Sequence, residues 1–434
     1  SGPAGGAILA ARIAQETGAD QVLSFDMGGT TAKLSLIDDF RPQMSRRFEI
    51  SRAARFIKGS GMPVRIPVIE MIEIGAGGGS IASVDSLGRV AVGPHSAGSE
   101  PGPVGFGKGG TDATVTDADI ALGYIDPDRF AEGRLQIDRA ASERAFSVGI
   151  GSKLDLNATA SAAAVTEIVD EAMASAARMH AVESGKDVSE RLMIAFGGNG
   201  PLHATRLARR AGVNRVLIPR DPGVGSAVGF LFAPVSFEII RSHYATLDAL
   251  DPAAVNALLQ DMASEATEVV RAGAPTGALN QRRVAFMRYK GQGHEIEIEL
   301  PQQALTNDDV AGLTVAFEAE YRRQFGRQVP GMTIEVLNWG LSISSAAPSL
   351  TDTPPTPSVR PITAESTRNI WCNVADDWRD AGVFDRANLD PGNTFDGPAL
   401  IVEPQTTTLV SADFRAHIDA RGNIWLTTIA GGPE

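Results

Sequence analysis

Apolar residues recur along this chain with two kinds of spacing, and the spacing predicts which segments are strands and which are helices. Short runs rich in Val, Ile, Leu and Phe predict strands; they cover residues 21–25, 32–37, 192–196, 215–219, 283–300 and 333–345, with further extended structure at 64–74. Longer stretches predict helices at residues 7–16, 158–183, 202–211, 251–273 and 307–325. The Gly-Pro-Gly-Gly residues before position 7 predict a turn that opens the first helix.

Changes in this pattern divide the chain into four predicted parts. Residues 1–240 carry strands and helices separated by glycine-rich turns and are predicted to form one core lobe. Residues 241–346 form a middle α+β region, and a linker rich in Pro and Thr occupies 347–361. Residues 362–434 are strand-rich with frequent turn signals, which predicts a C-terminal domain of their own.

Composition narrows the class of protein. The chain has 434 residues and a net charge of −13, so nucleic acid is not an expected partner. Cys372 is the only cysteine, which excludes an internal disulfide framework and suits a cytoplasmic protein. No apolar run reaches the length of a membrane-spanning helix, so no membrane association is expected.

The turn between the first two predicted strands combines a carboxylate, glycines and hydroxyls. It reads Asp26, Met27, Gly28, Gly29, Thr30 and Thr31, with Lys33 on the returning strand. The glycines allow a tight turn and the close approach of a bulky anion, so that successive amides can form a nest for phosphate. Asp26 would hold Mg²⁺ or orient an attacking water, and Lys33 could reach a phosphate. A plain hairpin turn explains the same residues, so both interpretations stay open.

Two further glycine clusters are candidate binding segments. Gly197, Gly198, Asn199 and Gly200 form a turn between a predicted strand and a helix, where a flat ligand can pack closely and the helix N-terminus favours anions. Gly77 and Gly78 lie in the segment 75–80, whose amides would line a substrate or phosphate cleft. An ordinary strand-to-helix turn and a sharp bend between strands are the respective alternatives.

The long loop predicted at 93–119 carries the candidate polar residues. His95 is the candidate general acid–base, and Asp112 is a candidate for binding Mg²⁺ or a substrate N–H. Thr116 or Asp117 is predicted to cap the helix that follows the loop. His203 is predicted to be a satisfied histidine in the first turn of its helix, and no His/Cys/Asp spacing matches a zinc signature.

Eight motifs occur in collinear order from residue 1 to about residue 427. They are SGPAGG, FDMGGT, GAGGGSIA, VGPHSAGSEPGP, GGTDATVTDAD, AFGGNGPLHA, YKGQGHE and GPALIVEPQTTTLV. Together they resemble the hydantoinase A/5-oxoprolinase family, which also includes subunits of ATP-dependent ketone carboxylases. The resemblance implies the α/β fold class, with an actin-like (ribonuclease H-like) ATPase lobe followed by a mixed α+β C-terminal region. In that superfamily a hairpin like that of Asp26 binds phosphates, and a turn like 197–200 contacts the adenosine.

The implied activity is hydrolysis of a cyclic amide, such as a hydantoin or 5-oxoproline, with ATP and Mg²⁺ as cofactors. Phosphorylation of the amide oxygen fits this chemistry, because an amide carbonyl is a poor electrophile and a phosphorylated oxygen is a good leaving group. Ketone carboxylation is the alternative enzyme activity, and a non-catalytic nucleotide-binding scaffold is the alternative outside enzymes. Sugar and acetate kinases fit less well, because their remaining motifs do not match this order.

The family pattern also implies parts that this sequence does not contain. Family members begin with an N-terminal lobe that carries another Asp-Gly-Gly-Thr hairpin, so we expect a first-lobe chain or segment to complete the nucleotide site and this chain to be inactive alone. A hydantoinase B-type subunit is the second implied partner. Two positions depart from the pattern: Lys33 stands where many members have an acidic residue, and residues 104–106 (Val-Gly-Phe) occupy a loop where many relatives have cysteine. The second departure excludes a mechanism that needs a thiol there.

Overall fold

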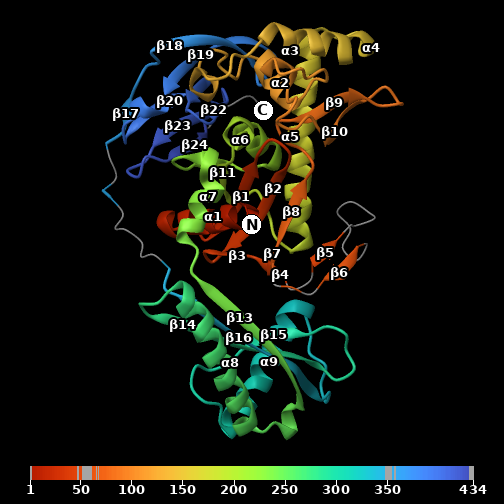
Figure 1. Cartoon of the computed structure of the whole chain (residues 1–434), viewed down its shortest axis with the longest axis vertical. Coiled ribbons are helices and arrows are strands. Elements are labelled where there is room, and N and C mark those ends of the chain that lie inside the picture. Colours follow the sequence, from red (N-terminus) through yellow and green to blue (C-terminus); the bar gives the residue numbers. More distant parts are fainter. Residues whose placement is uncertain are drawn as a thin grey trace. The chain divides into compact units, whose positions relative to one another are not determined.

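The computed structural model describes residues 2–45, 48–50, 61–64, 66, 68–347, 354–355 and 358–429. The chain forms two compact units, Ser1–Phe232 together with Leu350–Glu434, and Ala233–Ser349, and each is described by itself (Figure 1). The predicted boundary near residue 240 lies close to the junction between them. Among the described residues, no helix is both long and apolar enough to cross a membrane.

A ten-stranded sheet organises the first unit. Its order is β17-β20-β23-β24-β12-β11-β1-β2-β3, and β8 also pairs with β2. The bounds are β1 Gln21–Met27, β2 Ala32–Asp38, β3 Arg41–Pro42, β8 Met71–Ile74, β11 Leu192–Phe196, β12 Arg215–Ile218, β17 Arg360–Pro361, β20 Asn393–Asp396, β23 Phe414–Ile418 and β24 Ile424–Thr428. β1 is parallel to β11 and β11 to β12, whereas β2 is antiparallel to β1. The loops after β1, β11 and β12 therefore leave the sheet at the same edge, which is where open α/β sheets bind ligands.

The C-terminal strands belong to this sheet. β24 pairs antiparallel with β12, and β23 and β20 continue the sheet beyond it. The segment 362–434, predicted as a domain of its own, therefore lies in the same compact unit as the first 232 residues. Strand pairing over such a sequence distance has no local signal, since it depends on which edge of the sheet is left free.

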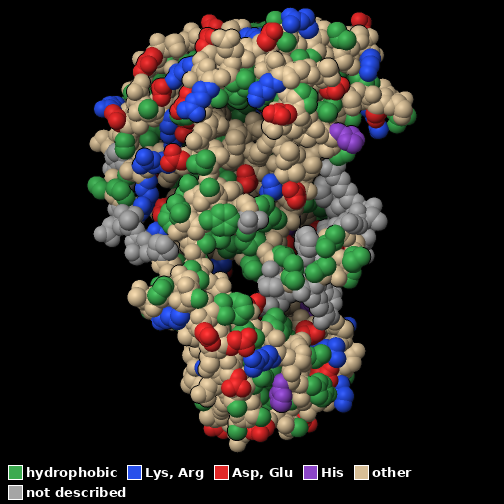
Figure 2. Space-filling view, viewed as in Figure 1, with side chains coloured by type: hydrophobic (Ala, Val, Ile, Leu, Met, Phe, Trp, Pro, Cys, Tyr) green, Lys and Arg blue, Asp and Glu red, His purple; other side chains and the backbone are tan. Residues whose placement is uncertain are grey.

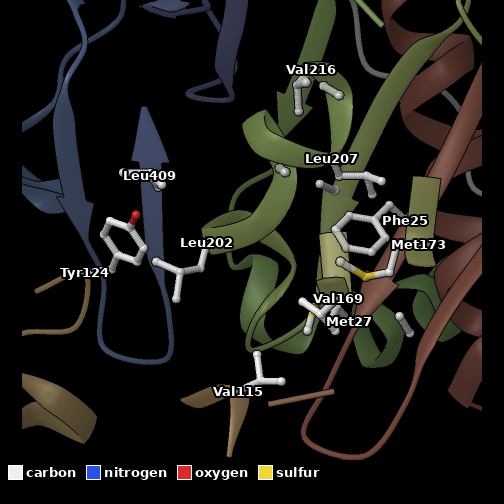
Figure 3. Close-up of a cluster of buried hydrophobic side chains, with 14 of the residues drawn as sticks. Phe25, Met27, Val115, Tyr124, Val169, Met173, Leu202, Leu207, Val216 and Leu409 are labelled. Atoms are coloured by element: carbon white, nitrogen blue, oxygen red, sulfur yellow. The ribbon is translucent and has the colours of Figure 1, made fainter. Parts of the chain in front are cut away.

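Helices cover both faces of the sheet. The helices of the first unit are α1 Gly2–Thr17, α2 Val115–Ala121, α3 Arg139–Phe146, α4 Ser152–Leu154, α5 Ala158–Glu183, α6 Gly200–Ala211 and α7 Gly225–Phe232, and α5 confirms the prediction for 158–183. Side chains alternate along a strand, so Phe25 and Met27 of β1 face Val169 and Met173 of α5 (Figure 3), whereas Val22 packs in the core on the side of α1. The sheet is thus buried on both faces at β1.

The turn predicted before residue 7 is wrong, because α1 already begins at Gly2. The glycines of α1 allow close packing on two neighbours. A Cβ on Gly229 of α7 would lie 1.8 Å from the carbonyl oxygen of Gly5, and a Cβ on Gly6 would lie 2.6 Å from the ring of Phe196 on β11. Only glycine lets the two helix backbones approach this far. Phe230 and Leu231 of α7 remain exposed, and Figure 2 shows hydrophobic side chains gathered over this part of the molecule.

Smaller sheets complete the first unit. A four-stranded sheet has the order β18-β19-β21-β22, and three further pairs are β9 with β10, β4 with β7 and β5 with β6. The bounds are β4 Met44–Ser45, β5 Phe48–Ile50, β6 Met62–Val64, β7 Val68–Ile69, β9 Ser80–Val84, β10 Val90–Ser96, β18 Ser366–Cys372, β19 Asp377–Asp385, β21 Ala399–Val402 and β22 Thr407–Val410. The extended segment predicted at 64–74 corresponds to β7 and β8 with the end of β6, as far as its residues are described.

The second unit is an antiparallel sheet packed against two helices. The order is β13-β16-β14-β15, and the bounds are β13 Ser236–Thr246, β14 Leu279–Tyr289, β15 Ile296–Glu299, β16 Ile334–Ser345, α8 Pro252–Gly273 and α9 Asn307–Phe325. The helices predicted at 251–273 and 307–325 are confirmed by α8 and α9. The strand run predicted at 283–300 is instead a hairpin, since the chain turns between Tyr289 and Ile296 with Gly291 at φ +89°. Trp339, Tyr289 and Phe317 are fully buried in the core of this unit.

Candidate functional site

The hairpin between β1 and β2 has an open tip. The N–H of Gly28 donates to the carbonyl of Thr31 at 3.1 Å and closes the turn. Gly29 and Thr30 are exposed, and among the described residues their amides have no hydrogen-bond partner. A Cβ on Gly28 or Gly29 would contact nothing, and neither residue has a positive φ. These glycines therefore keep the tip uncovered, whereas the turn itself does not need them.

Asp26 is a half-buried carboxylate next to this tip. The hydroxyl of Ser226, on α7, donates to Asp26 Oδ2 at 2.8 Å, while Oδ1 has no hydrogen-bond partner among the described residues. Burial raises the pKa of Asp26, and the Ser226 hydrogen bond and the charge of Lys33 oppose the rise. The free oxygen leaves Asp26 able to contact a cation or a water.

Lys33 is bound within the hairpin. It pairs with Asp26 across β1 and β2, and its Nζ donates to the hydroxyl of Thr31 at 2.7 Å. The same nitrogen lies 3.9 Å from Oε1 of Glu73. The ammonium therefore holds Thr31 in the structure, and its predicted reach to a phosphate would require leaving that hydroxyl.

Ser226 was not identified from the sequence, because it follows Asp26 by 200 residues and lies in a glycine-rich segment without a distinguishing motif. Replacing Ser226 with alanine is expected to raise the pKa of Asp26 further, since the hydroxyl donates to the ionised form. Any binding that needs the carboxylate would then be lost at a higher pH than in the wild type. A pH series of Mg²⁺·ATP affinity measures this shift, with Ser175→Ala as the control, since Ser175 bonds Glu171 at the surface. An unchanged midpoint would contradict the assigned hydrogen bond.

The glycine segment 75–80 supports the hairpin from its own backbone. The N–H of Gly78 donates to the carbonyl of Gly28 at 3.1 Å, and that of Gly79 donates to Gly29 at 2.6 Å. The N–H of Gly77 donates to the hydroxyl of Ser80. Cβ atoms here would collide, since one on Gly77 would lie 2.7 Å from the backbone of Gly29 and Thr30. The amides of Gly78 and Gly79 are thus committed to the hairpin and that of Gly77 to Ser80, so the segment positions the tip.

The turn from β11 to α6 is joined to the same hairpin. Gly197 has φ +91°, and the N–H of Asn199 donates to the carbonyl of Met27 at 2.9 Å. The side-chain amide of Asn199 donates to Gly28 at 3.1 Å. Gly200 begins α6, with Pro201 in its first turn. Gly198 is exposed, so Asn199 faces the hairpin and Gly198 is the part of the turn open to a ligand.

Among the described residues, no hydrogen bond or ion pair joins His95 or Asp112 to Asp26. His95 is exposed on β10, and Asp112 is exposed and accepts a hydrogen bond only from Thr111, at 3.2 Å. Their catalytic roles stay predictions. The cap prediction is wrong, because Thr114 caps α2 and Asp117 is its N3 residue. Asp117 is fully buried and instead accepts hydrogen bonds that anchor the loop at residues 104 and 105.

Behind the 197–200 turn lies a buried charged cluster of Asp119, Asp170, His203 and Arg206. His203 Nδ1 lies 2.7 Å from Asp170 and Nε2 lies 3.3 Å from Asp119. Arg206 donates to Asp170 at 2.7 Å. Burial alone would raise the pKa of Asp170, but Arg206 and His203 outweigh it and hold this pKa low. His203 is thus a satisfied first-turn histidine, as predicted, and the cluster ties α6 to α2 and α5.

A cavity of about 410 Å³ is lined in part by Gly198 and Asn199. Residues from three segments line it, within 125–134, 198–202 and 402–407. The hydroxyl of Thr406 donates to the carbonyl of Gly198 at 2.8 Å, which attaches the β21–β22 turn to the glycine turn. Glu403 in the same turn has a pKa raised to about 7 by burial, with Arg386 opposing the rise. We call this space the Glu403 cavity.

The fit of Mg²⁺ rests on the chemistry of the donor atoms. Among the described residues, no group of three or more His, Cys, Asp or Glu side chains is arranged to hold a metal ion. Mg²⁺ does not need such a group, since it is commonly held by one or two carboxylates together with phosphate oxygens and waters. Asp26, a carboxylate beside a tip with free backbone amides, fits that requirement.

Known proteins resemble this chain over nearly all of its length. Caprolactamase subunit alpha of Pseudomonas jessenii is 30% identical over 438 residues, covering 98% of this chain and 61% of that subunit. Acetophenone carboxylase gamma subunit of Aromatoleum aromaticum is 28% identical, covering 100% of this chain and 60% of that subunit. The nucleotide-free structure of acetone carboxylase aligns with a TM-score of 0.82 and 26% identity, covering 99% of this chain and 61% of that one. This chain therefore spans about three-fifths of the length of these relatives.

Two family patterns match as well. The pattern described as Hydantoinase/oxoprolinase covers residues 1–239, and the pattern described as Hydantoinase/oxoprolinase C-terminal domain covers residues 250–426. The first alone extends over more than half of the chain, and the two follow each other in the order that the eight motifs predict. The chain belongs to the hydantoinase/oxoprolinase family.

Proposed function

We propose that this chain binds ATP at the Asp26 hairpin and serves a hydantoinase A-type enzyme that hydrolyses a cyclic amide. The observation that carries the proposal is the hairpin tip, where the free amides of Gly29 and Thr30 lie beside a half-buried carboxylate. Amides that converge at an exposed turn form an anion-binding nest. The sheet order β8-β2-β1-β11-β12 supports an actin-like lobe, which the motifs imply.

Each part of the site has a role in this proposal. The amides of Gly29 and Thr30 would donate to phosphate oxygens, with the hydroxyl of Thr30 as a further donor. Asp26 would hold Mg²⁺, which neutralises phosphate charge, or orient an attacking water. The exposed Gly198 would allow the adenosine to pack on the 197–200 turn. Phosphorylation of the amide oxygen would then turn a poor electrophile into one that water can attack.

The substrate class rests on similarity. Caprolactamase acts on a cyclic amide by its name, and one solved relative is described as an ATP-dependent caprolactamase, with a TM-score of 0.76 at 28% identity. Ketone carboxylation is the second candidate, favoured by the likeness to acetone and acetophenone carboxylase subunits. A second, hydantoinase B-type chain is the proposed partner, and relatives are themselves subunits of larger enzymes. We further propose that a first-lobe chain or segment covers the other side of the nucleotide.

Titration of the chain with Mg²⁺·ATP by calorimetry tests the ATP site, alone and with the first-lobe segment of a relative supplied. Asp26→Asn should weaken binding at least tenfold, because the variant loses the charge that holds Mg²⁺. Asp39→Asn is the matched control: Asp39 is exposed, follows the far end of β2, and has a positive φ that asparagine tolerates. Binding that is equally tight in Asp26→Asn, or absent even with the first lobe, would refute the proposal.

A further inference from the structure

Glu403 is a buried carboxyl group in the wall of the Glu403 cavity. Its side chain is 8% exposed, and its Oε1 lies 4.0 Å from Nε of Arg386, which is too far for a hydrogen bond. Oε2 has no hydrogen-bond partner among the described residues. A buried polar atom without a partner is costly, so an acid in this state calls for a donor that the described chain does not supply.

The cavity has the size and lining of a small-molecule site. Its volume of about 410 Å³ lies within the usual range for such sites. Phe130 and Leu202 contribute apolar surface, while Glu403 and Thr406 contribute polar groups. The wall also carries charged side chains within 125–134, so it combines apolar surface for the faces of a ring with polar groups for its edge.

We propose that the Glu403 cavity binds a ring whose edge carries an N–H next to an acceptor atom, and that Glu403 recognises this edge. A carboxyl group complements such an edge, because its carbonyl oxygen accepts from the ring N–H and its O–H, when present, donates to the neighbouring acceptor. Adenine has this edge in its amino group and adjacent ring nitrogen. A cyclic amide has it in its N–H and C=O. The inference rests on the proposed function, since both rings occur in that reaction.

Hydrogen bonds connect this cavity to the phosphate-binding hairpin. Glu403 and Thr406 belong to one tight turn, in which the N–H of Glu403 donates to the carbonyl of Thr406 at 3.0 Å. Thr406 donates to Gly198, and the next residue, Asn199, donates to Gly28 of the hairpin. A ring in the cavity would therefore lie against one side of the 197–200 turn, with the hairpin attached to its other side.

The protonation of Glu403 provides a readout that a purely structural acid would not. A neutral acid pairs with both atoms of the edge, whereas a carboxylate pairs with the N–H alone and repels the acceptor. Binding is therefore expected to weaken as the pH rises through the pKa of Glu403, about 7. The charged groups that act on Glu403 or on its partner Arg386 are Arg386, Asp221, Asp385, Arg220 and Asp419. The other charged side chains that line the cavity are Asp126, Arg129, Glu132 and Arg134.

The test compares Glu403→Gln and Glu403→Leu with the wild type. Glutamine keeps a donor and an acceptor side by side, and leucine removes both. Adenosine, ε-caprolactam and hydantoin are titrated into each protein at about pH 6 and about pH 8.5, on either side of the pKa, with thermal unfolding measured in parallel. Glu365→Gln is the matched control, because Glu365 is an exposed carboxyl group bonded to Asn388 outside the cavity.

Glu403→Leu should weaken binding of the recognised ring about tenfold to a hundredfold. Glu403→Gln should bind it with no pH dependence.

The outcomes separate the two ring sources and the two proposals. If Glu403→Leu weakens the binding of adenosine alone, the inference is supported and the ring in the cavity is the base of the nucleotide. If it weakens the binding of the cyclic amides alone, the inference is supported and the ring is that of the substrate. Ring affinities that are the same in folded Glu403→Leu and the wild type overturn it. If Mg²⁺·ATP binding depends on Asp26 but no ring binding depends on Glu403, the inference fails and the proposed ATP site stands.

Discussion

Replacing Asp170 with alanine is expected to lower the free energy of unfolding by about 3–5 kcal/mol, the range measured when one partner of a buried ion pair is removed. Asp170 is 1% exposed and accepts hydrogen bonds from both His203 and Arg206. Without it, the guanidinium of Arg206 stays buried with Asp119 as its remaining acidic neighbour, 3.7 Å away. Chemical denaturation of the variant and the wild type measures the difference.

Glu171→Ala is the matched control for this prediction. Glu171 is the next residue on α5, and its carboxylate pairs with Arg178 at the surface with 47% of the side chain exposed. Exposed pairs contribute at most about 1 kcal/mol, so the control should unfold close to the wild type. Equal losses in the two variants would show that the buried cluster does not stabilise α6 as argued.

The cluster also predicts how this stability depends on pH. The pKa of Asp170 is lowered in the folded state, so its contribution is present above the unfolded value of about 3.9 and is lost as the pH falls through the folded pKa. For His203, burial would lower the pKa, but Asp119 and Asp170 raise it above the usual value. Its contribution is therefore full below about pH 6.5 and is lost as the pH rises through the folded pKa. The difference between the wild type and Asp170→Ala should shrink at low pH.

Gly197→Ala is expected to disrupt the proposed nucleotide site and to destabilise the fold by about 2–4 kcal/mol. Gly197 has φ +91°, where a side chain is strained. Its Cβ would also lie 2.4 Å from the carbonyl of Met27 and 2.6 Å from Oδ1 of Asp26. Either the turn or the end of β1 must move, and both carry parts of the site. Denaturation and Mg²⁺·ATP titration measure the two effects.

Gly198→Ala is the control for this prediction, because it separates the effect of backbone strain from the effect of replacing any glycine in the turn. Gly198 is the next residue, its φ is not positive, and a Cβ there would contact no described atom. The variant should unfold within about 1 kcal/mol of the wild type. If Gly197→Ala were equally mild, the close approach of this turn to Asp26 would not constrain the site.

Several features of this protein were determined by the sequence alone. The helices at 158–183 and 307–325 are predicted with the bounds that the structure has, because the spacing of apolar residues along a helix is a local signal. The hairpin at Asp26 and the turn at 197–200 were also visible locally, since glycines and polar residues interrupt apolar runs there. Family membership followed from the order of eight motifs.

Other features depend on contacts between distant parts of the chain. The packing of α7 brings the Ser226 hydroxyl to Asp26, and the parallel pairing of β1 with β11 brings the Asn199 side chain to Gly28. The segment 75–80 reaches the hairpin because β8, which precedes it, pairs with β2. The Glu403 turn joins β21 and β22 of the four-stranded sheet, and it lies beside the 197–200 turn because β22 is bound to α6, where the hydroxyl of Thr205 donates to the carbonyl of Leu409.

Local sequence sets the conformation of a segment, because its hydrogen bonds and side-chain spacing involve near neighbours. It does not set which segment lies against which, since that depends on the summed packing of all the elements. The residues of the candidate site were therefore predicted, whereas the partners that orient them, and the cavity beside them, were decided by the tertiary structure.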